Sequence, residues 1–346
     1  MRFGPGLLSS MILAGATLLS AAAQNPAKAD AVANFYKGKT VKIVVGFGVG
    51  GGYDIYGRLA AEHLGRFIPG NPTVIVENMP GGGGVRAASF LHVAAPKDGT
   101  VLSVIVQAIA FDSVLGNLPG KIDASTYNFI GRLTSNVEAQ FTWQASATKS
   151  LEDAKRNTVV VGATGATSPS TIVPRMLNET VGTKFKIVQG YPGTAEAALA
   201  MERGEVEGMM QSLESLQSAK PDWIAEKRIN FIWQLALKPH PDFPDVPAVG
   251  QLGDTPEEQS MLRLIAGTAD IGRSLVAPPE VPAERVAALR AAFQAMVADP
   301  EFQAAAKARN TNLDPASGEA LQEIVAAAMA TPKAVVERTR TIVTAK

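Results

Sequence analysis

Two glycine-rich segments constrain this chain more than any other feature of its sequence. Residues 41–45 and 73–77 are rich in β-branched residues and predict short strands. Each leads into a glycine segment, 46–52 or 81–84, and then into a helical pattern. Glycine allows unusual backbone angles and a close approach of ligand to the main chain. Free N–H groups and the dipole at a helix start favour an anion, so both loops are candidate anion sites.

The pairing of the two strands decides whether the loops act together. If the strands are parallel neighbours, both loops emerge at one sheet edge, where open α/β sheets bind ligands. A third buried strand over 101–106 supports a parallel sheet. Either loop alone could be a tight turn with no binding role. The pair favours a small ligand that carries carboxylates.

A dinucleotide site is the alternative for the first loop. Gly46, Gly48 and Gly51 match G-x-G-x-x-G after a strand, and Glu77 closes the next strand, where such folds place a ribose-binding acid. Glu77 lies beyond the usual spacing of about 20 residues, and the fingerprint gives the second glycine run no role. An exported or cytoplasmic NAD(P)-dependent oxidoreductase is therefore the runner-up.

The N-terminus and the composition predict an exported protein. Residues 1–23 combine Arg2, an apolar stretch over 7–19 and three alanines before Gln24, the pattern of a cleaved signal peptide, so we expect a periplasmic location. The 32 basic and 32 acidic residues balance, which gives no indication of a nucleic-acid partner. The absence of cysteine excludes disulfides and thiolate metal sites.

The residues that catalysis needs are not grouped in the sequence. His63, His92 and His240 are scattered, and neither H-E-x-x-H nor G-x-S-x-G occurs. Residues 146–149 match S-x-x-K but lack the accompanying K-T-G. We therefore expect no catalytic residues, no metal, no cofactor and no enzymatic activity.

The order of patterns predicts two lobes. The pattern changes at Tyr127, a second strand–helix block follows, and a proline-rich stretch over 238–247 leads back. We expect lobe I from residues 35–130 plus 240–346 and lobe II from 131–239. The C-terminal helices are expected to cover lobe I.

Four motifs together resemble one known family, the solute-binding receptors of tripartite tricarboxylate transporters, also called Bug-type or TctC-like receptors. The family patterns V-P-F-x-x-G-G-x-x-D and E-N-R-P-G-A-G-G are matched by V-G-F-G-V-G-G-G-Y-D at 45–54 and E-N-M-P-G-G-G-G at 77–84. Its Y-K-G and G-x-V-D are matched by Y-P-G at 191–193 and G-E-V-E at 204–207. The resemblance covers essentially the whole mature chain.

The resemblance implies a fold, a partner and a set of contacts. The fold is α/β, a type II two-lobed "Venus-flytrap" binding protein with a mainly parallel sheet in each lobe. The receptor would be a monomer that delivers a small organic mono- or dicarboxylate to integral-membrane transporter subunits. The implied ligand contacts lie in loops of both lobes: Phe47, Gly51, Gly52, Gly82, Gly83, Thr167, Ser168, Tyr191, Gly193 and Thr194.

Two charged residues near the loops have alternative roles. Asp54 is either a first-turn acid favoured by the helix dipole or an acceptor for the ligand. Arg86 either adds charge to the anion site or is a solvated helix residue. Because the glycine loops contain neither Lys nor Arg, we expect backbone N–H groups to carry most of the ligand's charge. Met79 and Pro192, which replace the family's Arg and Lys, favour a ligand with a more apolar body.

Overall fold

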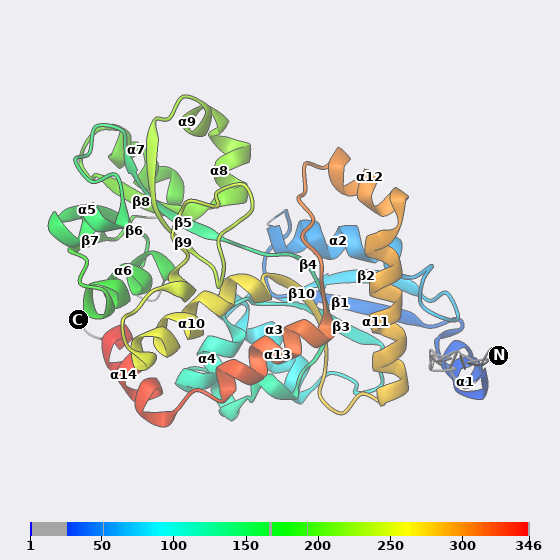
Figure 1. Cartoon of the computed structure of the whole chain (residues 1–346). Helices are drawn as coiled ribbons and strands as arrows, with labels where there is room; N and C mark the ends of the chain where they lie inside the picture. Colours follow the sequence, from blue (N-terminus) through cyan, green and yellow to red (C-terminus); the bar gives the residue numbers. More distant parts are fainter. Residues whose placement is uncertain (2–25, 51, 166–167, 192, 345–346) are drawn as a thin grey trace.

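The protein consists of two lobes, each built on one β-sheet flanked by helices (Figure 1). The computed structural model describes residues 1, 26–50, 52–165, 168–191 and 193–344. The expected signal peptide over residues 1–23 lies almost entirely outside the described residues. Among the described residues, no helix has the length and apolar character needed to cross a membrane.

The first sheet has the strand order β11-β4-β10-β3-β1-β2, and the second has the order β7-β6-β8-β5-β9. The strands of the first sheet are β1 (Thr40–Val45), β2 (Thr73–Asn78), β3 (Val101–Ile105), β4 (Asn128–Thr134), β10 (Arg273–Ala277) and β11 (Ala316–Ser317). Those of the second are β5 (Glu138–Trp143), β6 (Val159–Ala163), β7 (Phe185–Gln189), β8 (Gly208–Ser212) and β9 (Ile229–Leu235).

Helices cover both sheets. In the first part of the chain they are α1 (Pro26–Tyr36), α2 (Gly52–Leu64), α3 (Val85–Val93), α4 (Ile109–Leu115), α5 (Leu151–Arg156), α6 (Pro169–Thr180) and α7 (Thr194–Glu202). They continue with α8 (Leu213–Ala219), α9 (Pro221–Ala225), α10 (Pro256–Ile271), α11 (Ala283–Ala298), α12 (Pro300–Ala308), α13 (Gly318–Met329) and α14 (Lys333–Thr344). Short 3₁₀ turns are η1 (Gly82–Gly84), η2 (Pro119–Lys121), η3 (Ala124–Thr126) and η4 (Val249–Gln251).

The strands of each sheet run mainly in one direction. β1 is parallel to β2 and to β3, and β10 is antiparallel to both β3 and β4, so β4 runs with β1–β3. In the second sheet, β6 is parallel to β7 and β8, whereas β5 is antiparallel to its neighbours β8 and β9. Both sheets are therefore mixed: β10 and β11 run against the other strands of the first sheet, because β11 is also antiparallel to β4, and β5 runs against the others in the second. The predicted α/β fold class is confirmed.

These directions place the strand ends of both lobes at the boundary between them. β4 carries the chain into the second lobe through residues 135–137, so the carboxyl ends of β1–β3 also lie on the side of the second lobe. β9 leaves the second lobe at Leu235, and β6–β8 run with it, so their carboxyl ends lie on the side of the first lobe. The loops after both sets of strands consequently face the space between the lobes.

The first sheet is buried on both faces. Side chains alternate along a strand, and in β1 Ile43 belongs to the core on one face while Val44 belongs to the core on the other. All of β3 is buried as well. This explains the apolar runs at the centre of the sheet, as is usual for strands covered by helices on both sides, whereas the edge strand β2 alternates between exposed and half-buried residues.

The C-terminal helix α14 packs on both lobes. It contacts α4 of the first lobe, as expected of the C-terminal helices, and it also contacts α6 of the second lobe, which was not expected (Figure 1). The reason is its apolar face: Val335 and Ile342 are buried in one core with residues of α6. Pro332, just before α14, favours the change of direction after α13.

Candidate functional site

The two glycine loops of the first lobe are in direct contact. β1 and β2 are parallel and in register from Thr40 and Thr73 onward, so both loops leave the sheet at the same edge. The Met79 N–H donates to Val45 O at 2.8 Å. A Cβ placed on Gly46 would lie only 2.8 Å from Gly84 Cα, so position 46 has no room for a side chain. The predicted side-by-side arrangement of the two loops is therefore observed.

Asp54 fastens the first loop to the end of β2. Its carboxylate is almost fully buried and accepts hydrogen bonds from Gly50 N (2.8 Å), Arg58 Nε (2.9 Å) and Asn78 Nδ2 (2.8 Å). Asn78 Nδ2 also donates to Phe47 O at 3.0 Å. Burial would raise the pKa of Asp54, but these hydrogen bonds outweigh it and hold the pKa at about 2. Asp54 thus has a structural role in shaping the loop.

The second loop presents glycine backbone to solvent. Gly81, Gly82, Gly83 and Gly84 all have positive φ, which side chains other than glycine rarely adopt. The N–H groups of Gly84 and Arg86 both donate to Gly81 O. In the described part of the chain, the N–H groups of Gly82 and Gly83 have no acceptor, and both residues are exposed. They are therefore available to an anion.

Arg86 lies beside this loop and not over it. Its Cδ lies 3.1 Å from a Cβ placed on Gly81, and its guanidinium donates to Pro80 O at 3.3 Å at the surface. Arg86 is therefore exposed and packs against the loop.

An aromatic pair forms the rest of the first-lobe face. Phe47 stacks on Tyr53 with ring centroids 4.3 Å apart and an interplanar angle of 21°. The Tyr53 hydroxyl accepts from Gln107 N at 3.2 Å, and burial raises the pKa of Tyr53. Phe47 thus adds an apolar ring to this face of the first lobe.

The two predicted loops of the second lobe are also neighbours, because β6 and β7 are parallel. Gly190 N and Tyr191 N donate to Thr164 O and Ala163 O, both at 3.3 Å. Ser168 Oγ lies 2.6 Å from Ser170 Oγ at the start of α6.

The other predicted ligand contacts in the second lobe differ in whether they pack against the protein or are exposed. The Tyr191 ring lies over Gly162, 3.1 Å from where its Cβ would be, so this ring serves packing. Gly193 and Thr194 begin α7, and Thr194 is exposed. The predicted contacts Gly51 and Thr167 lie outside the described residues.

The site also contains a cation that the sequence did not indicate. Arg273 begins β10 at the carboxyl edge of β3 and β4 and is only 9% exposed. Its guanidinium lies against Gly52, where a Cβ would be 2.7 Å from Nη2, and over the Tyr56 ring at 4.9 Å. Its Nη1 donates to Glu214 Oε2 of the second lobe at 2.9 Å. The only signal was a charged residue opening the apolar run 274–277.

A second acid, Glu138, lies at the same boundary. It begins β5, opposite Ser212 and Leu235 of the neighbouring strands, and its charge raises the pKa of Tyr53 across the boundary. Burial raises the pKa of Glu138 itself to about 7. In the described part of the chain, its carboxyl group has neither a hydrogen bond nor an ion pair.

The histidines lie at separate places, as their scatter in the sequence indicated. The His63 ring packs on Phe302, the His92 ring on Tyr127, and the His240 ring on Phe243. Within the described ranges, no cluster of three or more acidic or histidine residues could hold a metal ion.

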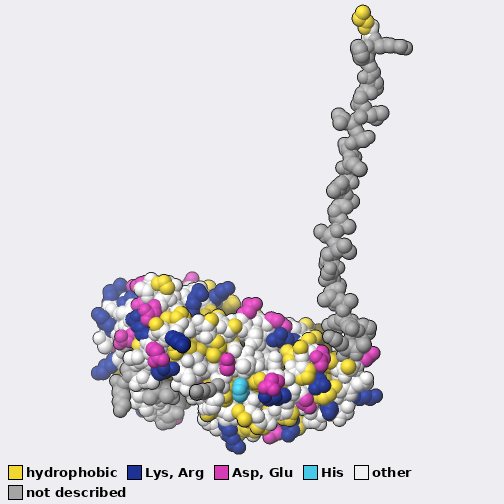
Figure 2. All heavy atoms as spheres, turned by 90° about the horizontal axis from the view of Figure 1, so that it is seen from below, with side chains coloured by type: hydrophobic (Ala, Val, Ile, Leu, Met, Phe, Trp, Pro, Cys, Tyr) yellow, Lys and Arg dark blue, Asp and Glu magenta, His cyan; other side chains and the backbone are white. Residues whose placement is uncertain are grey.

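Lys and Arg side chains are intermingled with Asp and Glu over the face shown in Figure 2.

Comparison with known proteins identifies a family. The family model described as "Tripartite tricarboxylate transporter family receptor" matches residues 58–340. The UPF0065 protein in the gbd 5' region of Cupriavidus necator is 25% identical over 262 residues, which cover 73% of this chain and 76% of that protein. A second UPF0065 protein, from Bordetella bronchiseptica, is 24% identical over 280 residues, 78% of this chain and 76% of its own.

Solved structures share the fold. A TctC solute-binding protein from Polaromonas has a TM-score of 0.68 at 20% identity, covering 88% of this chain and 99% of its own. Rpa4515 of R. palustris, solved with adipate, has a TM-score of 0.57 at 18% identity over 87% and 97% of the two chains. MatC from Rhodopseudomonas palustris, solved with malate, has a TM-score of 0.56 at 20% identity and covers 88% of this chain and 99% of its own. The family resemblance drawn from the loop motifs is confirmed.

The contact between the loops leads to a first prediction. Gly46→Ala should lower the free energy of unfolding by about 1–3 kcal/mol, because its Cβ would meet the Gly84 backbone. Gly48→Ala is the matched control, since no atom lies within 4 Å of a Cβ there, and it should change stability by less than about 1 kcal/mol. Urea unfolding measures both. Equal effects of the two variants would show that the loops are not in contact.

The burial of Asp54 leads to a second prediction, about pH. Its pKa is lowered from 3.8 to about 2, so its contribution is fully present above the unfolded value and is lost as pH falls through the folded value. Asp54→Asn should therefore lower the free energy of unfolding by about 2 kcal/mol at pH 7, and by progressively less as the pH falls from about 4 to about 2. Urea unfolding at several pH values measures this, with exposed Asp222→Asn as control. A pH-independent difference would refute the assignment.

Proposed function

Because the chain belongs to the tripartite tricarboxylate transporter receptor family, we propose that it captures a small organic carboxylate outside the cytoplasm and delivers it to the integral-membrane subunits of such a transporter. The expected signal peptide supports a periplasmic location. The proposed ligand is a mono- or dicarboxylate, without an obligatory amine, and the receptor acts as a monomer. Family and fold are those of solute-binding proteins, and we propose that this chain likewise catalyses nothing.

The observation that carries the proposal is the pair of glycine loops at the boundary between the lobes. Within the described residues, Gly82 and Gly83 offer exposed, unpaired N–H groups, and the loop that leads into α2 contacts their neighbour Gly84. Several convergent N–H groups can hold a carboxylate, because each hydrogen bond to a charged group contributes about 1.5–3 kcal/mol. The proposed contacts are those implied by the family motifs: Phe47, Gly51, Gly52, Gly82, Gly83, Thr167, Ser168, Tyr191, Gly193 and Thr194. Of the two roles of Asp54, the hydrogen bonds to Gly50, Arg58 and Asn78 favour the structural one over contact with the ligand.

Two lobes joined by extended crossings permit closure around such a ligand. The proposed lobes are residues 35–130 with 240–346 and residues 131–239. An adipate complex and a malate complex among the similar folds support a carboxylate ligand.

The arrangement around the first loop favours this proposal over a dinucleotide site. The acid of the fingerprint, Glu77, pairs with Lys42 at 3.0 Å on the outside of the sheet and is about half exposed. Asn78, the next residue, holds the loop instead. In a dinucleotide site the second glycine of the fingerprint, here Gly48, would allow the pyrophosphate to approach the backbone. A side chain at position 48 should therefore block dinucleotide binding, which makes Gly48→Ala a test of this alternative.

Ligand binding tests the proposed function directly. In a thermal-shift screen of organic acids, a carboxylate at a hundred times its dissociation constant should add about 2.7 kcal/mol of stability, while NAD(H) should add none. Gly48→Ala should leave acid binding unchanged. Stabilisation by NAD(H) that Gly48→Ala abolishes, with no acid bound, would establish the oxidoreductase alternative. Small-angle scattering should show compaction on saturation with the acid.

Variants in the second loop test how it holds the charge. Gly82→Val should abolish acid binding while circular dichroism remains native, since Val is strained at a φ of 54° and would cover the N–H groups. Arg86→Ala should weaken binding by no more than about tenfold, equivalent to about 1.4 kcal/mol. Isothermal titration calorimetry measures both. Normal binding by Gly82→Val with none by Arg86→Ala would show that a side-chain cation at this loop holds the carboxylate.

A further inference from the structure

One ion pair joins the two lobes beside the first glycine loop. Arg273, at the start of β10, contacts Gly52 in the first lobe. Glu214, in the first turn of α8, comes from the second lobe. Nη1 of Arg273 donates to Glu214 Oε2 at 2.9 Å, and the Tyr56 hydroxyl lies 3.0 Å from Glu214 Oε1. Two first-lobe side chains thus donate hydrogen bonds to the two oxygens of one second-lobe carboxylate.

The Arg273 guanidinium and the Tyr56 hydroxyl, which hold the Glu214 carboxylate, could hold any carboxylate in the same way. A guanidinium and a phenol hydroxyl are both donors, and an arginine pairs with planar carboxylates through several N–H groups. Here Glu214 uses only Nη1, and Nε of Arg273 is buried with no acceptor in the described part of the chain. The Tyr56 hydroxyl also lies 2.6 Å from Asn312 O, so its single proton is shared between two acceptors. Glu214 therefore leaves these donors incompletely satisfied.

We propose that Arg273 and Tyr56 form a carboxylate-binding position of the first lobe, which Glu214 occupies in this structure and which a carboxylate of the ligand takes over. The part that concerns the ligand rests on the proposed function. The position supplies the cation that the glycine loops lack. It lies next to them, since the guanidinium lies against Gly52 at the start of α2.

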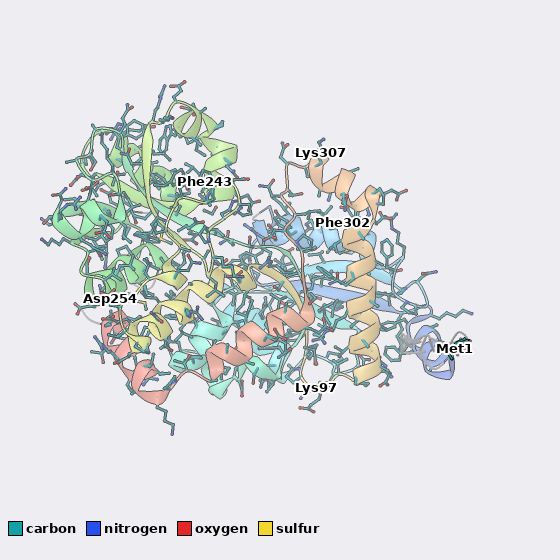
Figure 3. All side chains as sticks on the ribbon, in the orientation of Figure 1. Met1, Lys97, Phe243, Asp254, Phe302 and Lys307 are labelled. Carbon is teal, nitrogen blue, oxygen red and sulfur yellow. The ribbon has the colours of Figure 1, made fainter. Side chains whose placement is uncertain are left out.

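Two features favour replacement of the Glu214 carboxylate by a carboxylate of the ligand: the charges at this position and the space around Glu214. Arg273 is the cation in contact with Glu214, and two carboxylates on one partly buried cation would repel each other. The Glu214 side chain is 26% exposed, against 11% for Arg273. It borders two inter-lobe pockets of about 360 and 700 Å³, into which it can withdraw. Lys307 of α12, labelled in Figure 3, lines the larger of these pockets from the first lobe.

Chemical rescue tests the position without knowledge of the natural ligand. Glu214→Ala leaves Arg273 and Tyr56 without their carboxylate, so sodium acetate should raise the melting temperature of this variant well above its value in sodium chloride of equal ionic strength. Wild type and Glu214→Ala/Arg273→Met should show a clearly smaller difference, because Arg273 is either already paired with Glu214 or removed. The control Glu226→Ala removes an exposed acid from Arg228 and should behave like wild type. Acetate effects that are equal in all four proteins would overturn the proposal.

Binding of the natural acid tests the exchange. Glu214→Gln keeps the shape of the side chain and weakens its hold on Arg273, so the acid should bind about threefold or more tightly than to wild type. Arg273→Lys should weaken binding by about tenfold or more, since Lys cannot replace a planar guanidinium. Weaker binding by Glu214→Gln would overturn the exchange, because Glu214 would then support the ligand. This experiment also decides the case if Glu214→Ala fails to fold.

The two experiments separate this inference from the proposed function. Acetate rescue in a protein that binds no organic acid of the screen would uphold the carboxylate position and refute the function. Acid binding by wild type, with no rescue and with Glu214→Gln unchanged, would uphold the function and refute the position.

Discussion

The parallel pairing of β1 with β2 places two glycine loops against each other, and the geometry of the first-lobe face depends on this contact. Because the strands are in register, their loops leave the sheet together, and Gly46 meets the Gly84 backbone with no side chain between them. Asp54 and Asn78 then hold the first loop to the second strand by buried hydrogen bonds. The exposed N–H groups of Gly82 and Gly83 are thus held on a rigid support.

The strands that run against the others connect this face to the second lobe. β10 returns to the first sheet antiparallel to β3, which puts Arg273 at the edge where the loops emerge. β5 does the same in the second sheet and puts Glu138 at the opposing edge. The reversed strands β10 and β5 therefore add charged side chains to a boundary otherwise formed by glycine and hydroxyl loops.

Local patterns in the sequence predicted much of this fold. The strands before the two loops, the second strand–helix block after Tyr127 and the C-terminal helices are all found in the structure. Each is encoded by a short pattern that one element satisfies by itself. The parallel pairing could be inferred as well, because successive strand–helix units favour it.

The contacts that depend on distant parts of the chain could not be predicted in the same way. β10 pairs with strands far from it in sequence, and no local pattern fixes that register, so Arg273 was missed along with its partner Glu214. Asp54 was found, but its three hydrogen-bond donors come from the loop, its own helix and β2, and only the fold brings them together. The position of α14 on α6 likewise depends on a match between two apolar faces.

Fully charged and unpaired, the acids at the boundary would repel an anionic ligand, but their surroundings limit that repulsion. The charge of Glu214 is countered by Arg273 at 2.9 Å. Glu138 has no such partner among the described residues, but burial raises its pKa to about 7, so its neutral form is populated near neutral pH. A neutral carboxyl group donates a hydrogen bond, which a carboxylate can accept. The boundary can therefore carry two acids from the second lobe and still present donors to an anion.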